Sequence, residues 1–282
     1  MTTFATSEPI TATLTTGGAH VRIAASERSD TVVRVEPINK ASKTDLKVAE
    51  KTKVDFSAGA LTVETAKAGD KAGSVAITIE LPVGSKLVLN TAWTHVHADG
   101  VLGDCELNVA SGQVELDRVA ALHGNLAAGS IAIGHIAGTV DIEGGTASMR
   151  VGEVAGVARY RGTTGKVWIG HALSDVDLSG SSGSFDIDRA EGNVVAKASN
   201  CPIRIGQMIR GQAELTNASG GIEIGISEGT ATSVDANSTK GAVRNSLPSQ
   251  DNPAEFDSTE FDNKVKLYAR TRLDDIVIRA AV

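Results

Sequence analysis

Three side chains that recur along the chain could bind a metal ion. Each step between His135, Glu153 and His171 is 18 residues, and imidazole nitrogens and carboxylate oxygens are common zinc ligands. If the three lie on successive strands, the two histidines are two strand spacings of ~4.8 Å apart, too far to share one ion. The spacing therefore favours a solvated polar ladder, which Arg118 and Arg189 extend. We expect no metal and no cofactor, and a zinc titration by calorimetry tests this.

Carboxylates could perform a second kind of chemistry, the acid–base cleavage of polysaccharides. The candidates lie at outward positions of the same repeat: Asp141, Asp177, Asp186 and Asp188. Such catalysis needs two carboxyl groups about one sugar bond, in environments that separate their pKa values. Arg159 and Arg204 alternate with these acids along the repeat, which favours structural ion pairs. We therefore predict that the protein is not an enzyme.

The two cysteines indicate neither a nucleophile nor a disulfide. Cys105 falls at an inward position, where cysteine behaves as a small apolar residue, and Cys201 precedes Pro202 in a predicted turn. The two are separated by several repeats, so we expect no bond between them.

Composition excludes further classes of function. The chain of 282 residues has 34 acidic and 27 basic residues, a balance that opposes attraction to nucleic acid. No apolar run reaches the ~18 residues of a membrane span. The opening MTTFATSEPITATL has neither the basic start nor the apolar core of a secretion signal. The sequence therefore predicts a cytoplasmic protein without a transmembrane segment.

The elements that would position these side chains follow from an internal repeat. An apolar series advances by 17, 18, 18, 18, 18, 19 and 21 residues through Val114, Ile131, Met149, Val167, Phe185, Ile203, Ile222 and Val243. A second series lies two residues later and a third lies nine residues earlier, so each unit holds two short alternating strands. Stacked units bury apolar faces that none could bury alone. We predict an all-β protein, a β-solenoid or related stack of about 18 residues per coil.

Outward positions predict the register of the stacked strands. One column alternates in charge from coil to coil: Asp186, Arg204, Glu223 and Arg244. Opposite charges on neighbouring strands favour this alignment. A glycine column runs through Gly134, Gly152, Gly170, Gly206 and Gly225. Such recurrence indicates either a positive φ or a close approach of adjacent coils.

The segments on either side of the repeat are predicted to cap it. The expected divisions are an N-terminal β-rich cap at 1–84, the solenoid at 85–245, and a loop with C-terminal capping strands at 246–282. The first cap contains a predicted short helix over Ser42–Lys51, with Thr44 or Asp45 as N-cap. The final strands are predicted at Lys264–Ala269 and Asp275–Ala280.

Several segments match one known family. They are the opening FATSEPITATLTTGGAHVRIAASERSDTVVRVEP, the run DLKVAEKTKVDFSAGALTVE, the junction IELPVGSKL and the ending DDIVIRAA, together with repeated S/T-G-x-hydrophobic-x-hydrophobic units. With these, essentially the whole chain resembles a bacterial family of β-strand-repeat proteins labelled "putative adhesin", a domain of unknown function. The resemblance implies a stacked β architecture and defines no catalytic or ligand residue.

The sequence predicts a scaffold or protein-interaction module, because stacked repeats present a regular, extended surface to partners. The longer steps near Ile222 and Val243 indicate turn insertions around Gly229–Lys240, the expected contact with a protein partner or a second copy of the chain. The alternative is a carbohydrate-binding, adhesin-like or carbohydrate-active β-helical protein. The partner, the oligomeric state and the handedness of the solenoid stay open.

Overall fold

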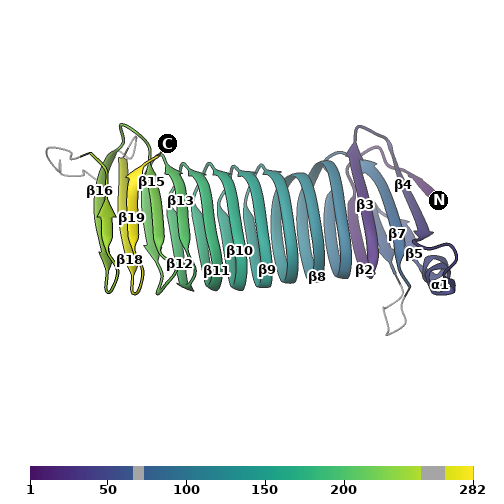
Figure 1. The fold of residues 1–282 in the computed structure, drawn as a ribbon. Coiled ribbons are helices and arrows are strands. Elements are labelled where there is room, and N and C mark those ends of the chain that lie inside the picture. The colour runs from purple at the N-terminus through teal and green to yellow at the C-terminus, as the bar shows by residue number, and fades with distance from the viewer. Residues whose placement is uncertain (66–72, 249–263, 282) are drawn as a thin grey trace. The chain divides into compact units, whose positions relative to one another are not determined.

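The computed structural model describes residues 1–65, 73–248 and 264–281. It divides into two compact units, Met1–Glu143 and Gly144–Val282. Both are built from strands, and the described residues contain a single helix, so the predicted all-β class is confirmed. The parallel strands wind into stacked coils of a β-solenoid-like fold (Figure 1). The predicted division at residues 84 and 245 stays a prediction.

In the first unit, the coil that comes first in the chain is not the outermost one. Its parallel strands are β2 (Thr11–Gly17), β3 (Ala19–Ser26), β6 (Ala60–Glu64), β7 (Val75–Pro82) and β8 (Lys86–Ile136). β8 is a continuous strand of 51 residues that turns repeatedly (Figure 1). β2 pairs with both β6 and β8, and β3 pairs with both β7 and β8. The coil β2–β3 therefore lies between β6–β7 and the start of β8.

Antiparallel strands and the helix cover the outer coil of this unit. They are β1 (Thr2–Ala5), β4 (Asp30–Pro37), β5 (Lys53–Ser57) and α1 (Lys43–Lys51). β5 pairs with β6, β4 pairs with β7, β1 pairs with β4, and α1 packs against β4 and β7. The helix is capped by Ser42, whose Oγ accepts from the backbone N–H of Asp45, rather than by Thr44 or Asp45 as expected. Ser42 has the extended backbone that an N-cap requires.

The second unit is also built from stacked parallel strands. Its strands, with β9 reaching back to Val140 in the first unit, are β9 (Val140–Val154), β10 (Ala158–Ala172), β11 (Val176–Ala190), β12 (Val194–Asn200), β13 (Ile203–Met208), β14 (Gly211–Thr216) and β15 (Ile222–Ile226). Partners on β10 and β11 are 18 residues apart, as in Ala158↔Val176. Between β12 and β14 the step is 19, as in Val194↔Ala213. The coil that begins at β12 therefore contains one more residue than the coil before it, and the pairing of β12 with β14 stays in register.

The last strands of the chain do not cap the stack. They are β16 (Ala231–Ser238), β17 (Val243–Asn245), β18 (Lys264–Thr271) and β19 (Ile276–Ala280). β18 pairs with β14 on one side and β16 on the other, and β19 lies in the same way between β15 and β17. The strands predicted as C-terminal caps are therefore an inserted inner coil, with β16–β17 outside it. A periodic sequence shows that coils are alike, not which of them are neighbours.

This insertion also corrects the predicted charge column. Asp186, Arg204 and Glu223 are register partners as expected, but Val277 of β19 separates Glu223 from Arg244. Arg244 instead pairs with Asp275, with Nη2 to Oδ2 at 3.1 Å. The 21-residue step from Ile222 to Val243 likewise spans an intervening coil, not neighbouring ones.

The glycine column is explained by close approach of the coils. A Cβ at Gly134, Gly206 or Gly225 would lie 2.7, 2.7 or 2.0 Å from a carbonyl oxygen of the preceding coil. The φ angles of these glycines lie outside the left-handed region. Of the two explanations that the sequence left open, the structure supports contact between backbones.

The inward columns form the core of each unit. Val114 and Ile131 in the first unit and Met149 and Val167 in the second are all buried. Tyr160 is also fully buried, and its hydroxyl donates to the Ala147 carbonyl at 3.2 Å. This bond satisfies the one polar atom of a large side chain in an aliphatic interior.

Candidate binding hollow

Two of the predicted metal candidates, Glu153 and His171, belong to a hydrogen-bonded ladder in the second unit. His171 Nδ1 lies 3.4 Å from Glu153 Oε2, and its Nε2 lies 2.9 Å from Oε1 of Glu191, a residue that the sequence analysis missed. Arg189 Nη2 lies 3.0 Å from the same oxygen. Hydrogen bonds from His171 and then Arg189 lower the pKa of Glu191. His135 lies half-buried at the end of β8, in the first unit.

No metal centre is apparent within the described ranges 1–65, 73–248 and 264–281. There, no group of three or more His, Cys, Asp or Glu side chains is placed to hold an ion. Zinc binding usually draws on three or four protein ligands. The expectation that the protein holds no metal stays a prediction, with zinc calorimetry as its test.

Two of the four carboxylates considered for catalysis, Asp186 and Asp188, form ion pairs with one arginine. Arg204 Nη1 lies 2.7 Å from Asp186 Oδ1 and 3.4 Å from Asp188 Oδ1. The hydrogen bond to Asp186 raises the pKa of Arg204. Asp177 is the register partner of Arg159, whereas Asp141 lies on β9 in the first unit. These contacts favour the structural interpretation of the acids.

Both cysteines are buried and free. Desolvation raises the pKa of Cys105 to about 12 and that of Cys201 to about 11. Because the thiolate is the nucleophile, thiols held in this protonated form are unreactive at neutral pH.

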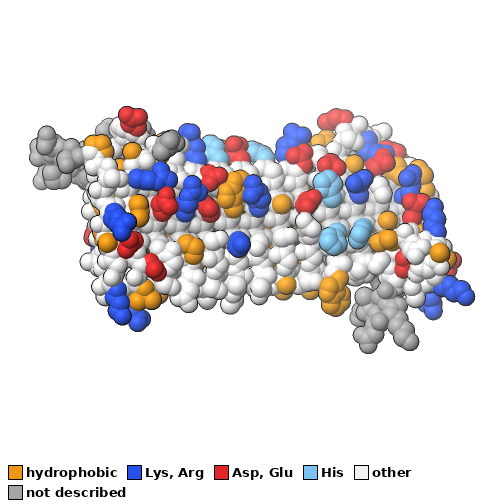
Figure 2. Space-filling model, in the orientation of Figure 1, with side chains coloured by type: hydrophobic (Ala, Val, Ile, Leu, Met, Phe, Trp, Pro, Cys, Tyr) orange, Lys and Arg blue, Asp and Glu red, His pale blue; other side chains and the backbone are white. Residues whose placement is uncertain are grey.

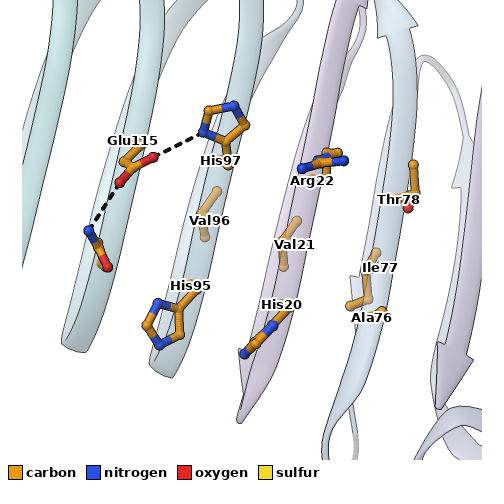
Figure 3. Close-up of a pocket in the computed structure, with 11 residues that line it drawn as sticks. His20, Val21, Arg22, Ala76, Ile77, Thr78, His95, Val96, His97 and Glu115 are labelled. Carbon is orange, nitrogen blue, oxygen red and sulfur yellow. Dashed lines mark hydrogen bonds and ion pairs between the residues drawn. The ribbon is translucent and has the colours of Figure 1, made fainter. Parts of the chain in front are cut away.

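A hollow of about 370 Å³ opens on the outward face of the first unit, over β7, β3 and two turns of β8 (Figure 3). Strand register builds its lining. One row places His20 beside His95, and the next outward row places Arg22 beside His97. Val21, between the two rows on β3, points into the core and is buried. Alternation along parallel strands therefore gathers basic and imidazole side chains on one surface.

Two imidazoles form one side of the hollow. The rings of His20 and His95 have centroids 5.1 Å apart and planes inclined by 65°, an edge-to-face contact. Both side chains are exposed, and neither makes a hydrogen bond or ion pair with another residue that the structure describes. Space-filling shows pale-blue histidine atoms gathered over this part of the unit (Figure 2).

The third imidazole is held by carboxylates. His97 Nδ1 lies 3.1 Å from Glu115 Oε2 (Figure 3). Its Nε2 lies 3.1 Å from Asp99 Oδ1. Gln113 Nε2 donates to the other Glu115 oxygen at 3.0 Å. Glu115 and Asp99 are thus occupied by neighbours on their own strand.

An exposed tryptophan occurs two residues before His95. Trp93 is 70% exposed and has a φ of 49°, in the left-handed region that non-glycine residues rarely adopt. The next residue, Thr94, is fully buried, and its Oγ1 lies 3.1 Å from Thr16 Oγ1 and donates to the Ala92 carbonyl at 3.0 Å. A Cβ at Gly112 would lie 2.2 Å from the Thr94 carbonyl oxygen, so the next coil also presses on this corner. These contacts hold Trp93 outward in an unfavourable backbone conformation.

The comparisons with known proteins give the family. The model of the family described as Toastrack DUF4097 matches residues 10–278. The chain belongs to this family. No curated protein sequence matches it significantly.

Solved structures similar to this Toastrack family member include three described as putative adhesins. One described as a "putative adhesin" from Bacteroides fragilis is 10% identical with a TM-score of 0.36, over 98% of this chain and 95% of that one. Another from Parabacteroides distasonis is 11% identical with a TM-score of 0.36 and the same coverage. A third, from Parabacteroides merdae, is 13% identical with a TM-score of 0.32, over 79% of this chain and 94% of that one. The family match, rather than these structures, identifies the chain.

The sequence analysis missed the hollow, although one signal was available. In the segment THVHAD, His95 and His97 alternate with Val96, which places both on the outward face of a strand. Their neighbours His20 and Arg22 are 75 residues earlier, and only the pairing of β3 with β8 brings them alongside. None of the described helices of this Toastrack protein is long and apolar enough to cross a membrane.

Proposed function

We propose that this protein is a non-enzymatic scaffold that binds a partner protein at the outermost coil of its second unit. The observation that carries the proposal is the outer side of that coil, where no described strand pairs with β16 or β17. Among the described strands, β16 pairs only with β18, and β17 only with β19. Val234, at an inward position of β16, is only half-buried, and Val243 of β17 is 42% exposed. Backbone groups and apolar side chains are thus both available there.

Ion pairs between outward side chains support a role in binding a partner, because they favour one register of the strands that form the outward face. Lys197 Nζ lies 2.8 Å from Glu214 Oε1 on the neighbouring coil, and Arg279 Nη2 lies 2.9 Å from Glu223 Oε1. Each pair joins strands that are already in register. Exposed pairs contribute little stability individually, but a repeated series favours one alignment of the face.

The occupant we propose is an extended segment of the partner, added as a strand along Ser233–Ser238. This range lies within Gly229–Lys240, the contact predicted from the sequence, although the strand β16 occupies it rather than the predicted turn insertion. Edge strands that avoid association usually carry lysine, proline or a bulge. β16 reads ATSVDANS and has neither lysine nor proline. Strand addition obtains affinity from main-chain hydrogen bonds and specificity from alternate side chains.

Affinity purification from native cells, identification of the partner and titration with the purified partner test the proposal. Asn237→Lys places a charge on the open edge, and we expect at least about tenfold weaker binding. Ser199→Lys is the matched control, because Ser199 is exposed on β12, which is paired on both sides. Equal affinities for the wild type and both variants would overturn the proposed contact. Fractionation of the same cells tests the predicted cytoplasmic location.

Carbohydrate binding is the second candidate function, and Trp93 favours it. An indole held outward offers a flat apolar face, and the imidazoles and guanidinium of the hollow supply hydrogen-bond donors nearby. A glycan array with the whole chain tests this alternative, and saturable binding is the supporting result. Recovery of the protein at the cell surface would favour an adhesin-like role.

A further inference from the structure

The cationic side of the hollow has no acidic partner among the residues that the structure describes. Arg22 is exposed and makes no hydrogen bond or ion pair with any residue in the described part of the chain. The His20–His95 pair lies on the same face, in the neighbouring outward row. A guanidinium presents donors in a planar fork that fits a carboxylate.

The nearby acids leave this side of the hollow open to an anion. Glu115 accepts from Gln113 and lies against His97, which also binds Asp99, so both carboxylates are engaged on β8. On β7, the outward residues that line the hollow are Ala76 and Thr78, which are uncharged. Beyond β7, Glu36 and Arg34 of β4 are opposite these two residues and offset each other in charge.

A metal ion is the competing ligand for clustered imidazoles. His97 is occupied by two carboxylates, which leaves only His20 and His95. Within the described residues, no group of three or more possible ligands is placed to hold an ion. An anionic ligand uses the same two imidazoles as hydrogen-bond donors and also uses Arg22.

We propose that this hollow binds an acidic saccharide, whose carboxylate lies at Arg22 and the His20–His95 pair and whose next ring reaches Trp93, which lies two residues before His95 and outside the lining of the hollow. The volume of about 370 Å³ is at the small end of ligand pockets and suits one or two sugar rings. Trp93 favours a sugar over a simple anion, since its indole is 70% exposed and its backbone has a strained φ of 49°. This inference deepens the carbohydrate-binding alternative and is independent of the proposed contact on β16.

Calorimetric titration of the full chain with acidic tetrasaccharides tests the proposal. The probes are tetragalacturonic acid, tetramannuronic acid and a hyaluronan tetrasaccharide, and the reference is the methyl ester of the first, which has the same shape without charge. At least one acid should bind about tenfold more tightly than the ester. The proposal is overturned if none of the three acids binds. It is also overturned if tetragalacturonic acid is the only acid that binds and its ester binds equally well.

Variants locate the site. Arg22→Gln should weaken the acid about tenfold, whereas Arg118→Gln makes the same charge change on an exposed arginine outside the hollow and should have no effect. Trp93→Ala should weaken the saccharide several-fold. Binding that survives both Arg22→Gln and Trp93→Ala would place the ligand elsewhere and refute the assignment. Because Arg22 has no described partner, the melting temperature of its variant should match that of the wild type.

The imidazole pair is tested by a variant of its own. His95→Ala removes one of the hydrogen-bond donors beside Arg22 and should weaken the acid several-fold. Unchanged affinity would remove the pair from the site. Capture of a partner protein by the Arg22→Gln variant separates this result from the β16 proposal, which predicts unchanged capture.

Discussion

The N-terminal end of the first unit and the C-terminal end of the second both place their outermost coil out of chain order, but among the described elements only the first end has strands and a helix over that coil. At the first end, β6–β7 lies outside β2–β3, which precedes it in the chain. At the second end, β16–β17 lies outside β18–β19, which follows it. In each case, the coil nearest the chain terminus is paired on both sides.

The two outer coils differ in what covers them. β5, β4, β1 and α1 lie over the first, and its inward residues Val63 and Ile77 are buried. The second has no described strand on its outer side, and Val234 and Val243 stay partly accessible. Inserting a coil pairs the strands near the chain terminus on both sides. Burying the inward apolar residues of the outermost coil requires further elements packed over that coil. The difference is why we place the partner contact at the second end.

Two glycines with positive φ should show the largest contrast. A Cβ at Gly100 would lie 2.1 Å from the Ala25 carbonyl oxygen on the inserted β3, whereas Gly229, before β16, has no atom within 4 Å of that position. Gly100→Ala should lower the free energy of unfolding by about 3 kcal/mol or more. Gly229→Ala should cost only about 1 kcal/mol, the backbone penalty alone. Urea denaturation measures both, and equal losses would contradict the difference in coil packing.

Matched valines should give the next largest effect. Val63→Ala removes buried methyl groups from the covered outer coil and should cost about 2 kcal/mol. Val234→Ala in the open coil should cost about half as much or less, because the side chain is only half-buried. If the purified partner restores the burial, its addition should raise the melting temperature of the wild type more than that of Val234→Ala.

Asp45 gives the covered end a dependence on pH. Its carboxylate accepts from the backbone N–H of Ser74 at 3.1 Å and of Asn39 at 3.0 Å, and these bonds lower its pKa from 3.8. The stabilisation is therefore present above the unfolded pKa and is lost as pH falls through the lower, folded pKa. Asp45→Asn should melt below the wild type at pH 7, and the gap should close at about pH 2. Glu50→Gln, exposed on the same helix, is the control and should show no such gap.

The smallest effect is expected from the ion pairs of the two ends. Arg28 Nε lies 2.9 Å from Asp30 Oδ1 at the covered end, and Arg270 Nη2 lies 2.7 Å from Asp235 Oδ2 at the open end. Arg28 is the less exposed of the two arginines. Arg28→Gln should therefore lower the melting temperature slightly more than Arg270→Gln, and 1 M salt should reduce both effects. A large, salt-independent loss at Arg270 would show that the open end depends on its outward charges.

Much of the repeat was predictable because alternation and periodicity are local properties. Buried Val114 and the register partners Asp186 and Arg204 follow from spacing alone. The sequence left two causes for the glycine column, and backbone contact between coils decided between them. His171 was singled out with Glu153, but its second carboxylate, Glu191, lies 20 residues later and off the 18-residue column.

The hollow shows where sequence reasoning stopped. His95 and His97 could be placed on one face from their spacing, but nothing local predicts that β3 pairs with that turn of β8. The sequence contains Trp93, but it does not reveal that the backbone of this residue has a left-handed conformation.

The sequence by itself determined the all-β class, the stacked repeat and which side chains point inward, because these depend on apolar alternation within each strand. The tertiary structure alone decided which coils are neighbours: it inserted β2–β3 and β18–β19 beneath the outer coils and brought His20 and Arg22 to β8. Coils of similar length and pattern can stack in more than one order. The order realised depends on how the ends bury their apolar layers, which is a property of the assembled chain.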